Sequence, residues 1–217
     1  MPGVEWVVLK DGRTPMQAGR DARCVPNNRM AVCSRVLKRE LIRGYLDEHF
    51  DPATSIVYLG YDWSEEDRRA QAAAPWEPWQ VECPLMDPPK MDKRQILDSL
   101  RNRGITPPRL YALGFSHANC GGACVRGGQV DWRRLLFWNP ARYAEWESEE
   151  EATRALLGKD VSILRDRRDE RDKEGVAMSL REYRERLTAD ATLFDPEDAG
   201  GCGCDPWRDT EDALTHG

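Results

Sequence analysis

The stretch Ser-Ile-Val-Tyr-Leu-Gly-Tyr-Asp at residues 55–62 is the clearest strand pattern of the chain. Its continuous apolar, β-branched run predicts a strand buried inside a sheet rather than one at an outer edge. Residues 63–66, Trp-Ser-Glu-Glu, follow directly and predict the start of a helix capped by Ser64, with Asp67 in its first turn. A strand that leads straight into a helix is typical of α/β proteins.

Segments on both sides continue this alternation. Short β-branched runs predict two further strands, at residues 4–10 and 80–85. Apolar residues at helical spacing, each group preceded by a capping or turn residue, predict helices over residues 34–46, 90–103, 131–136, 141–157 and 179–187. Residues 14–28 and 166–174 lack periodicity and predict polar connections, the first of them mobile and basic. The pattern indicates an α/β layer with mostly parallel strands up to residue 114, followed by a helical region.

Length and composition favour one soluble core. The chain has 217 residues and a mass of 24.8 kDa, of which 40% are hydrophobic and 32% charged. It is long enough to bury one core and too short for two full-sized enzymatic domains. No run of about 18 apolar residues occurs, and the N-terminus lacks the pattern of a secretory signal. We therefore predict a cytoplasmic protein that does not associate with a membrane.

The net charge of -6 is concentrated near the C-terminus. Residues 195–212 hold seven acidic residues against one arginine, so the remaining chain balances at 31 acidic and 31 basic residues. Residues 10–43 carry nine basic against three acidic residues, and residues 101–134 carry six arginines against Asp131. These two basic segments favour an anionic ligand such as a nucleotide or nucleic acid, and solvated helix faces explain either segment equally well.

Seven cysteines in a chain without an export signal favour metal binding or redox chemistry over disulfides. Cys120 and Cys124 are separated by three residues that include Gly121 and Gly122. The two glycines allow a tight turn that points both sulfurs toward one place, as a zinc ion or an iron–sulfur centre requires.

Two other cysteine clusters strengthen this interpretation. Cys202 and Cys204 lie in an equally glycine-rich segment. Cys33 lies at the start of the helix predicted over residues 34–46, whose basic residues would lower the pKa of a thiol. We predict that the three clusters converge on one site; the alternative is that these are reduced cysteines buried as small apolar residues. His117 is a candidate ligand or proton carrier, and a hydrogen-bonded loop histidine is the alternative for it.

A second constellation follows the strand at residues 55–62. Asp62 and Glu65 stand where the strand ends and the next helix begins, and Arg68 falls one turn after Glu65. This is where ligands bind in open α/β sheets. Acidic residues that complement the helix dipole explain the same pattern. The chain contains neither G-x-x-x-x-G-K-[ST] nor G-x-G-x-x-G, so it carries no ready-made phosphate loop.

Four stretches, taken in order, resemble the phosphoadenosine phosphosulfate reductase family of the PP-loop ATP pyrophosphatase superfamily, particularly its phage and mobile-element members. Cys33-Ser-Arg-Val-Leu-Lys38 resembles the family element Cys-[Ser/Thr]-x-x-Leu-Lys, and residues 58–68 resemble its Gly-x-[Asp/Ser]-x-x-Glu-x-x-Arg. Residues 81–108 resemble the segment before the cysteine loop. The loop and its following helices are matched by Asn119 to Val125 with Trp132, Pro140, Tyr143 and Glu147.

The resemblance implies a partial adenine nucleotide α-hydrolase-like (HUP/Rossmann-like) fold. Its expected parts are an incomplete PP-loop-type α/β domain at 1–114, a cysteine-loop and helical region at 115–194, and an acidic tail with cysteines at 195–217. The family binds ATP phosphates on a Ser-Gly-Gly-x-Asp-Ser loop, which this sequence lacks. We therefore expect one half of a split protein, a truncated copy, or a binding module descended from an enzyme.

Two functions follow from the resemblance. The first is a reductase-like or ATP-pyrophosphatase-like enzyme acting on an adenine nucleotide or sulfonucleotide, with ATP and magnesium or a phosphosulfate nucleotide as ligand. Its iron–sulfur cluster or zinc ion would be held by Cys33, Cys120, Cys124 and Cys202 or Cys204, and its nucleotide by Arg35, Lys38, Asp62, Glu65, Arg68, His117, Asn119 and Arg126. The second is a non-catalytic, metal-stabilised subunit that binds nucleic acid or a partner chain carrying the missing loop.

Overall fold

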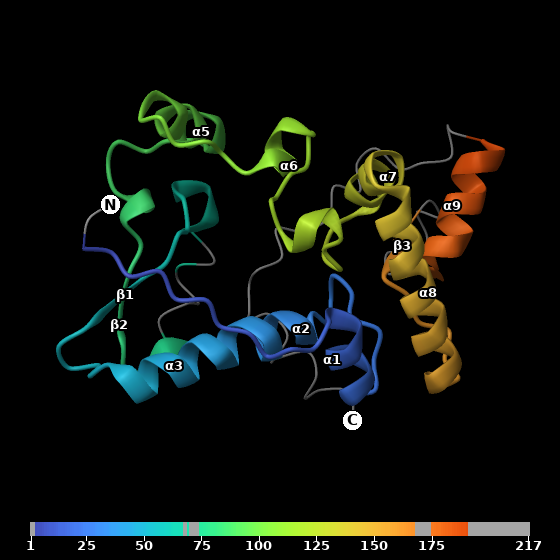
Figure 1. Cartoon of the computed structure of the whole chain (residues 1–217), viewed down its shortest axis with the longest axis horizontal. Coiled ribbons are helices and arrows are strands. Elements are labelled where there is room, and N and C mark those ends of the chain that lie inside the picture. The colour runs from blue at the N-terminus through green and yellow to red at the C-terminus, as the bar shows by residue number, and fades with distance from the viewer. Residues whose placement is uncertain (1–2, 67–68, 70–73, 168–174, 191–217) are drawn as a thin grey trace. The chain divides into compact units, whose positions relative to one another are not determined.

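The computed structural model describes residues 3–66, 69, 74–167 and 175–190 (Figure 1). These residues form two compact units. The first unit takes in residues 3–41 and 110–190, and the second takes in the described residues between 42 and 109. The second unit is therefore inserted in the sequence between two halves of the first. The boundaries predicted at residues 114 and 194 stay predictions, and the tail at 195–217 lies outside the described residues.

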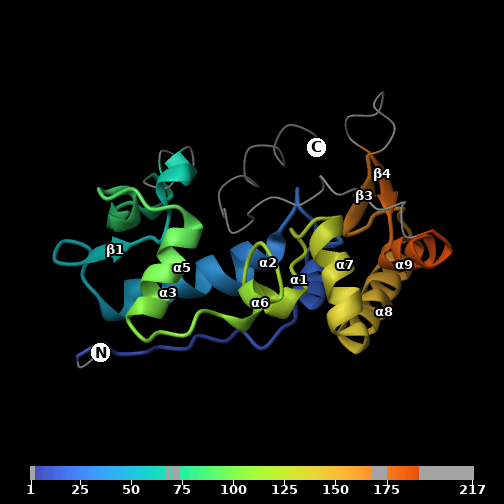
Figure 2. The same ribbon diagram turned by 90° about the horizontal axis from the view of Figure 1, so that it is seen from above.

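The first unit is mainly helical. Its N-terminal half contains α1 (Pro15–Asp21), α2 (Val32–Ser34) and the π-helical segment η1 (Arg35–Glu40). Its C-terminal half contains α6 (Arg109–Ala112), η5 (Cys120–Gly122), α7 (Gln129–Trp138), α8 (Pro140–Leu157), β3 (Leu164–Asp166), β4 (Val176–Met178) and α9 (Leu180–Ala189). The strands β3 and β4 pair antiparallel and lie next to α9 (Figure 2).

The second unit contains one small parallel sheet. Its elements are α3 (Leu41–His49), β1 (Ile56–Tyr58), η2 (Trp63–Glu65), η3 (Ala74–Trp76), β2 (Gln80–Glu82), η4 (Pro84–Met86) and α5 (Lys93–Asn102). Strands β1 and β2 run parallel, with Val57 opposite Val81. Taken together, the described residues form a mostly helical α/β structure with two small two-stranded sheets, one of them parallel. None of the helices in this described part is long and apolar enough to cross a membrane.

The strand predictions are confirmed in part. Strands form at 56–58 and 80–82, inside the predicted ranges, but both are short. The prediction that the first is buried in a sheet is wrong, because Ile56 and Tyr58 are exposed and β1 pairs only with β2 among the described residues. The predicted strand at 4–10 is also wrong. Its residues Val4, Trp6, Val7 and Val8 are exposed, and the segment joins no sheet of the described chain. Apolar and β-branched residues form a strand only where a partner supplies the hydrogen bonds.

The helix predictions are largely confirmed, with three corrections. Ser64 does not precede its helix, because it lies inside the 3-10 helix η2. The basic segment at 14–28 is not a mobile connection, because α1 begins there with a reciprocal capping box between Thr14 and Gln17. Ser34 does not cap its helix. It is buried within a continuous helical run that already begins at Val32. Ser179 does cap α9 by accepting a hydrogen bond from the Glu182 amide, as predicted.

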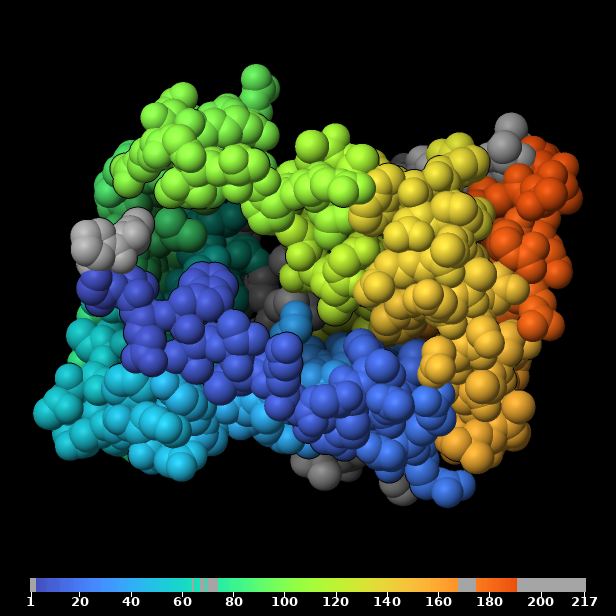
Figure 3. Space-filling view, in the orientation of Figure 1, coloured from blue at the N-terminus to red at the C-terminus, as the bar shows by residue number. Residues whose placement is uncertain are grey.

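One hydrophobic core holds the first unit together. Trp132 and Leu135 of α7, Tyr143 of α8 and Leu180 of α9 are fully buried in it. The ring of Trp132 packs edge-on against that of Tyr143, with centroids 5.9 Å apart. In the space-filling view α7, α8 and α9 lie side by side (Figure 3). The apolar residues spaced along the three helices therefore build one shared interior.

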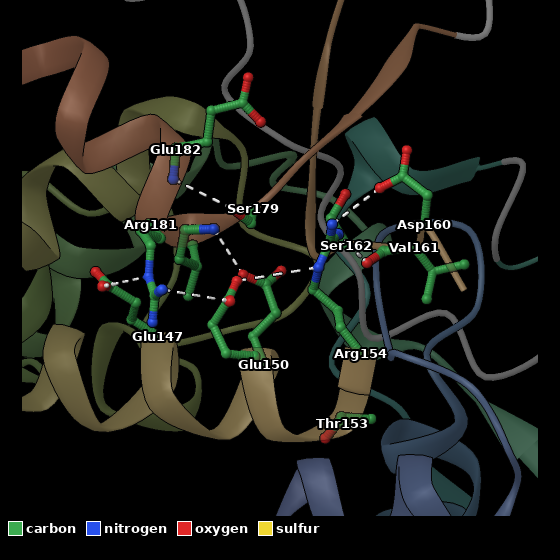
Figure 4. Close-up of polar contacts among 12 residues, drawn as sticks. Glu147, Glu150, Thr153, Arg154, Asp160, Val161, Ser162, Ser179, Arg181 and Glu182 are labelled. Carbon is green, nitrogen blue, oxygen red and sulfur yellow. Dashed lines mark hydrogen bonds and ion pairs between the residues drawn. The ribbon is translucent and has the colours of Figure 1, made fainter. Parts of the chain in front are cut away.

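A buried carboxylate of α8 lies within the first unit. Glu150 of α8 is fully buried, and its two oxygens accept hydrogen bonds from the backbone amides of Ile163 at 2.7 Å and Leu180 at 2.6 Å (Figure 4). Tyr143 donates a hydrogen bond to the carbonyl of Leu180 at 2.7 Å. Both backbone polar groups of Leu180 are thus held by side chains of α8. Burial raises the pKa of Glu150 to about 7, although both amides and Arg154 favour the charged form.

We expect Glu150 to make stability depend on pH. Its pKa is higher in the folded chain than the usual value for glutamate, so folding favours the protonated form. This contribution is fully present below about pH 4 and is lost as the pH rises through about 7, a change of about 1 to 3 kcal/mol. Glu150→Gln should remove this part of the pH dependence, measured as unfolding free energy between about pH 5 and pH 8.

An exposed glutamate of the same helix supplies the control for this prediction. Glu145→Gln in the same helix removes the same charge at a solvated position and should keep the pH dependence of the native chain. Parallel pH profiles for the native chain and Glu150→Gln would contradict the assignment.

Candidate thiol pocket

Three of the predicted metal-binding cysteines line one cavity in the first unit. Cys33 comes from α2, and Cys120 and Cys124 come from the loop around η5. The cavity has a volume of about 130 Å³, and its other walls are mostly apolar, including Ala31 and Val125. All three cysteines are free thiols and half-buried. We call this cavity the thiol pocket.

The backbone of the cysteine loop is as tight as its glycines predict. Cys120, Gly121 and Gly122 have φ values of 50°, 62° and 88°, so three consecutive residues lie in the left-handed region. Only glycine adopts this conformation without strain, and at Gly122 a Cβ atom would also meet the ring of Phe115 at 3.1 Å. The glycines therefore set the direction in which the two thiols of the loop point.

An arginine of α8 supports the loop from outside the pocket. The guanidinium of Arg142 donates a hydrogen bond to the carbonyl of Cys120 at 3.0 Å. Arg142 lies in the capped first turn of α8, where the Asn139 side chain accepts a hydrogen bond from the backbone amide of Arg142 at 3.1 Å. Sequence reasoning missed this residue, although the pair Asn139-Pro140 is a recognisable helix start.

Two cationic side chains also line the thiol pocket. Lys38 lies in η1, whose π-helical turn is one residue wider than an α-helical turn, and it reaches the same cavity as Cys33. Arg126 follows the cysteine loop and is buried. The pocket thus combines thiol groups with positive charge, which suits an anion held close to the sulfur atoms.

The thiols affect one another electrostatically. A hydrogen bond with Cys120, together with burial, raises the pKa of Cys124 far above its usual value, and Lys38 opposes this rise. Burial and the neighbouring Cys124 raise the pKa of Cys33 to about 11, again opposed by Lys38. The raised pKa values keep Cys33 and Cys124 protonated at neutral pH, so these two thiols exchange their protons for any metal that they bind.

The donor set suits a soft metal, since thiolates are the ligands of zinc and of iron–sulfur clusters. Across the described residues, no group of three or more His, Cys, Asp or Glu side chains is already arranged to hold a metal ion. The other two predicted ligands, Cys202 and Cys204, lie outside the described residues. The thiol pocket on its own therefore supplies three donors around a space, and the metal prediction stays a prediction.

His117 and Asn119 lie beside the thiol pocket. Together with Cys124 they line a smaller cavity of about 10 Å³. Arg35 does not line either cavity. It forms an ion pair with Glu40 at 2.7 Å and lies close enough to Cys24 to affect the pKa of that thiol.

Two further predicted ligands, Asp62 and Glu65, belong to the second unit. The Asp62 amide donates to the Glu65 carboxylate at 3.2 Å, and the Glu65 amide donates to the Asp62 carbonyl at 3.0 Å. These bonds close the turn at η2. Arg68 lies outside the described residues.

Comparison with known proteins returns no match to a protein-family model, a curated protein or a solved structure.

Gly122→Ala should destabilise the first unit by about 1 to 3 kcal/mol, because alanine is strained at this positive φ and its methyl group meets Phe115. Thermal or urea unfolding measures the change. Gly44→Ala is the matched control: Gly44 lies inside α3 with open space around it, so alanine should stabilise by up to about 1 kcal/mol. Equal effects at the two positions would show that the loop tolerates a side chain.

Proposed function

We propose that this chain is a phosphoadenosine phosphosulfate reductase-like or ATP-pyrophosphatase-like protein that binds a metal centre in the thiol pocket and an adenine nucleotide or sulfonucleotide beside it. The observation that carries the proposal is the convergence of Cys33 with Cys120 and Cys124, from distant parts of the sequence, on a cavity that Lys38 and Arg126 also line. Cysteines that serve only as small apolar residues would not require neighbouring thiols or cationic side chains.

The thiols of the pocket suit either a zinc ion or an iron–sulfur cluster. Zinc bonds sulfur at about 2.3 Å. Cys120 and Cys124 already contact each other through a hydrogen bond, and the cavity that they line with Cys33 has a volume of about 130 Å³. A cluster would supply electron transfer or a Lewis-acidic iron. The residues of the chain hold the thiolates in place through the glycine turn and the Arg142 contact.

Lys38 and Arg126 are proposed to bind the anionic part of the nucleotide. Phosphate and sulfate groups form their strongest hydrogen bonds with cationic donors. Arg126 is buried and Lys38 is exposed, so together they reach from the interior of the pocket to its solvent side. A negative group between them would lie next to the thiols, where a reductase needs it.

One observation favours the non-catalytic alternative. The sequence has no Ser-Gly-Gly-x-Asp-Ser loop, and the parallel pairing in the described chain is limited to three residues of β1 and β2. In the alternative, the metal stabilises a subunit that binds nucleic acid or a partner carrying the loop. Calorimetry with magnesium ATP separates the two: tight binding by this chain alone supports the enzyme, and weak binding supports the subunit.

Protein purified without oxygen should contain about one metal centre per chain. Cys33→Ala and Cys124→Ala should each reduce the content to near zero, because thiolates from separate segments must close the site together. Iron, sulfide and zinc analysis with an absorption spectrum measures the content and identifies the metal. Cys83→Ala is the control, since this thiol is buried in the second unit and should leave the metal unchanged. Metal-free native protein with a cooperative melt would rule out the centre.

Lys38→Ala should weaken nucleotide binding by about 1 to 3 kcal/mol, since it removes one charged contact with a phosphate. Arg39→Ala should change it by less than about 0.5 kcal/mol, because Arg39 does not line the thiol pocket. Calorimetry with the tightest-binding of ATP, adenosine phosphosulfate and its 3′-phosphate measures both variants, and unchanged melting shows that they fold. Equal small effects would mean that η1 presents only a solvated basic face.

A further inference from the structure

A second cavity lies against α7. It has a volume of about 380 Å³ and is lined by Leu113, Val130, Arg133, Arg134, Phe137 and Trp138. It shares no residue with the thiol pocket. Its volume falls within the range of small-molecule sites and suits one nucleotide. We call it the α7 pocket.

Two arginines of α7 are followed, one turn later, by two aromatic residues. Arg133 and Phe137 are four residues apart, as are Arg134 and Trp138, so each arginine lies one turn from an aromatic ring. The guanidinium carbon of Arg133 lies 5.5 Å from the centroid of the Phe137 ring. This cation–π contact holds the charge beside the ring.

Phe137 is 70% exposed, which is unusual for a phenylalanine in a helix that packs on the core. Trp138, its neighbour, is fixed by an edge-on contact with Phe115, with centroids 6.0 Å apart. The pocket therefore presents one open aromatic ring next to one whose orientation is set by packing. An exposed ring beside a cation is the arrangement that stacks a planar base.

The charge around the α7 pocket is positive. Asp131 is the acidic residue of α7, and it already accepts hydrogen bonds from the Ser116 hydroxyl at 3.1 Å and from Arg134 at 3.2 Å. Arg133 adds a second guanidinium at the pocket wall. The pocket thus favours an anion with a flat, apolar part.

We propose that the α7 pocket binds a nucleotide unit, with its base stacked on Phe137 and its phosphate at Arg133 and Arg134. A free mononucleotide and an exposed nucleotide of a single strand share this chemistry. Phosphate charge gives affinity that falls with salt, and stacking gives affinity that depends on the base. The two contributions come from different residues of the pocket and can be separated.

Fluorescence anisotropy of the full chain with labelled oligothymidylate of about ten nucleotides tests the strand, and an abasic strand of the same length removes the bases. Phe137→Ala should weaken binding of the thymidylate about tenfold and leave the abasic strand unchanged. Arg133→Gln should weaken both strands and lower the salt dependence, log K against log salt, by about 0.7. Calorimetry with AMP tests the free nucleotide with the same variants.

Two control variants match these changes. Leu156→Ala removes an equally exposed apolar side chain of α8, and Arg94→Gln removes an exposed arginine of α5; both should bind like the native chain. Lys38→Ala alters only the thiol pocket, so Phe137→Ala should weaken binding equally in the native chain and in the Lys38→Ala chain. A failure of the proposed function in the thiol pocket is therefore distinguishable from a failure of the α7 pocket proposal. Weaker binding of the thymidylate strand or of AMP by Phe137→Ala supports the proposal, and the ligand affected shows whether the pocket takes a single strand or a free nucleotide. Binding in neither arm, or binding that both pocket variants leave unchanged, overturns it.

Discussion

Glu150 holds the backbone amides of Ile163 and Leu180 against α8, and the arrangement of the C-terminal half of the first unit follows from that contact. The first amide lies just before the β3–β4 hairpin and the second at the start of α9. Because both amides are buried, loss of the carboxylate would leave each without its partner, at about 1 to 3 kcal/mol apiece. One turn earlier, Glu147 pairs with Arg184 of α9 at 2.8 Å and reinforces the same attachment.

The same helix also contacts the cysteine loop and α1. Near its N-terminus Arg142 holds the carbonyl of Cys120. Near its C-terminus Glu149 and Thr153 accept hydrogen bonds from Arg20 of α1, the helix that precedes the Cys33 segment. The two sources of cysteine are thus attached to one rigid element. A site built on a helix keeps its geometry better than one built on loops alone.

Sequence reasoning succeeded where the decisive signal is local. The helices α5, α7, α8 and α9 were predicted because caps and apolar spacing lie within each segment, and the turn at Gly121 and Gly122 follows from glycine itself. It failed where partners are distant. The burial of Glu150 depends on the amides of Ile163 and Leu180, which lie 13 and 30 residues away in the sequence.

The same distinction explains the errors near the N-terminus and the strands. The β-branched run at 4–10 has strand composition, but composition cannot provide a neighbouring strand. In α1 the local signal was present in Thr14 and Gln17, and the surrounding arginine and glycine obscured it. Cys33 and the cysteine loop line one cavity, whereas the third predicted cluster lies outside the described residues and the nature of the occupant depends on chemistry that spacing does not encode.

The insertion of the second unit between the halves of the first has a consequence for biosynthesis. Cys33 leaves the ribosome before any part of the second unit, whereas Cys120, Cys124 and α8 follow it. At usual rates of synthesis, about 5 to 20 residues per second, several seconds pass between the synthesis of Cys33 and that of Cys120 and Cys124. During that interval Cys33 is accessible to solvent and to oxidants, because the residues that line its pocket after Lys38 have not yet been made.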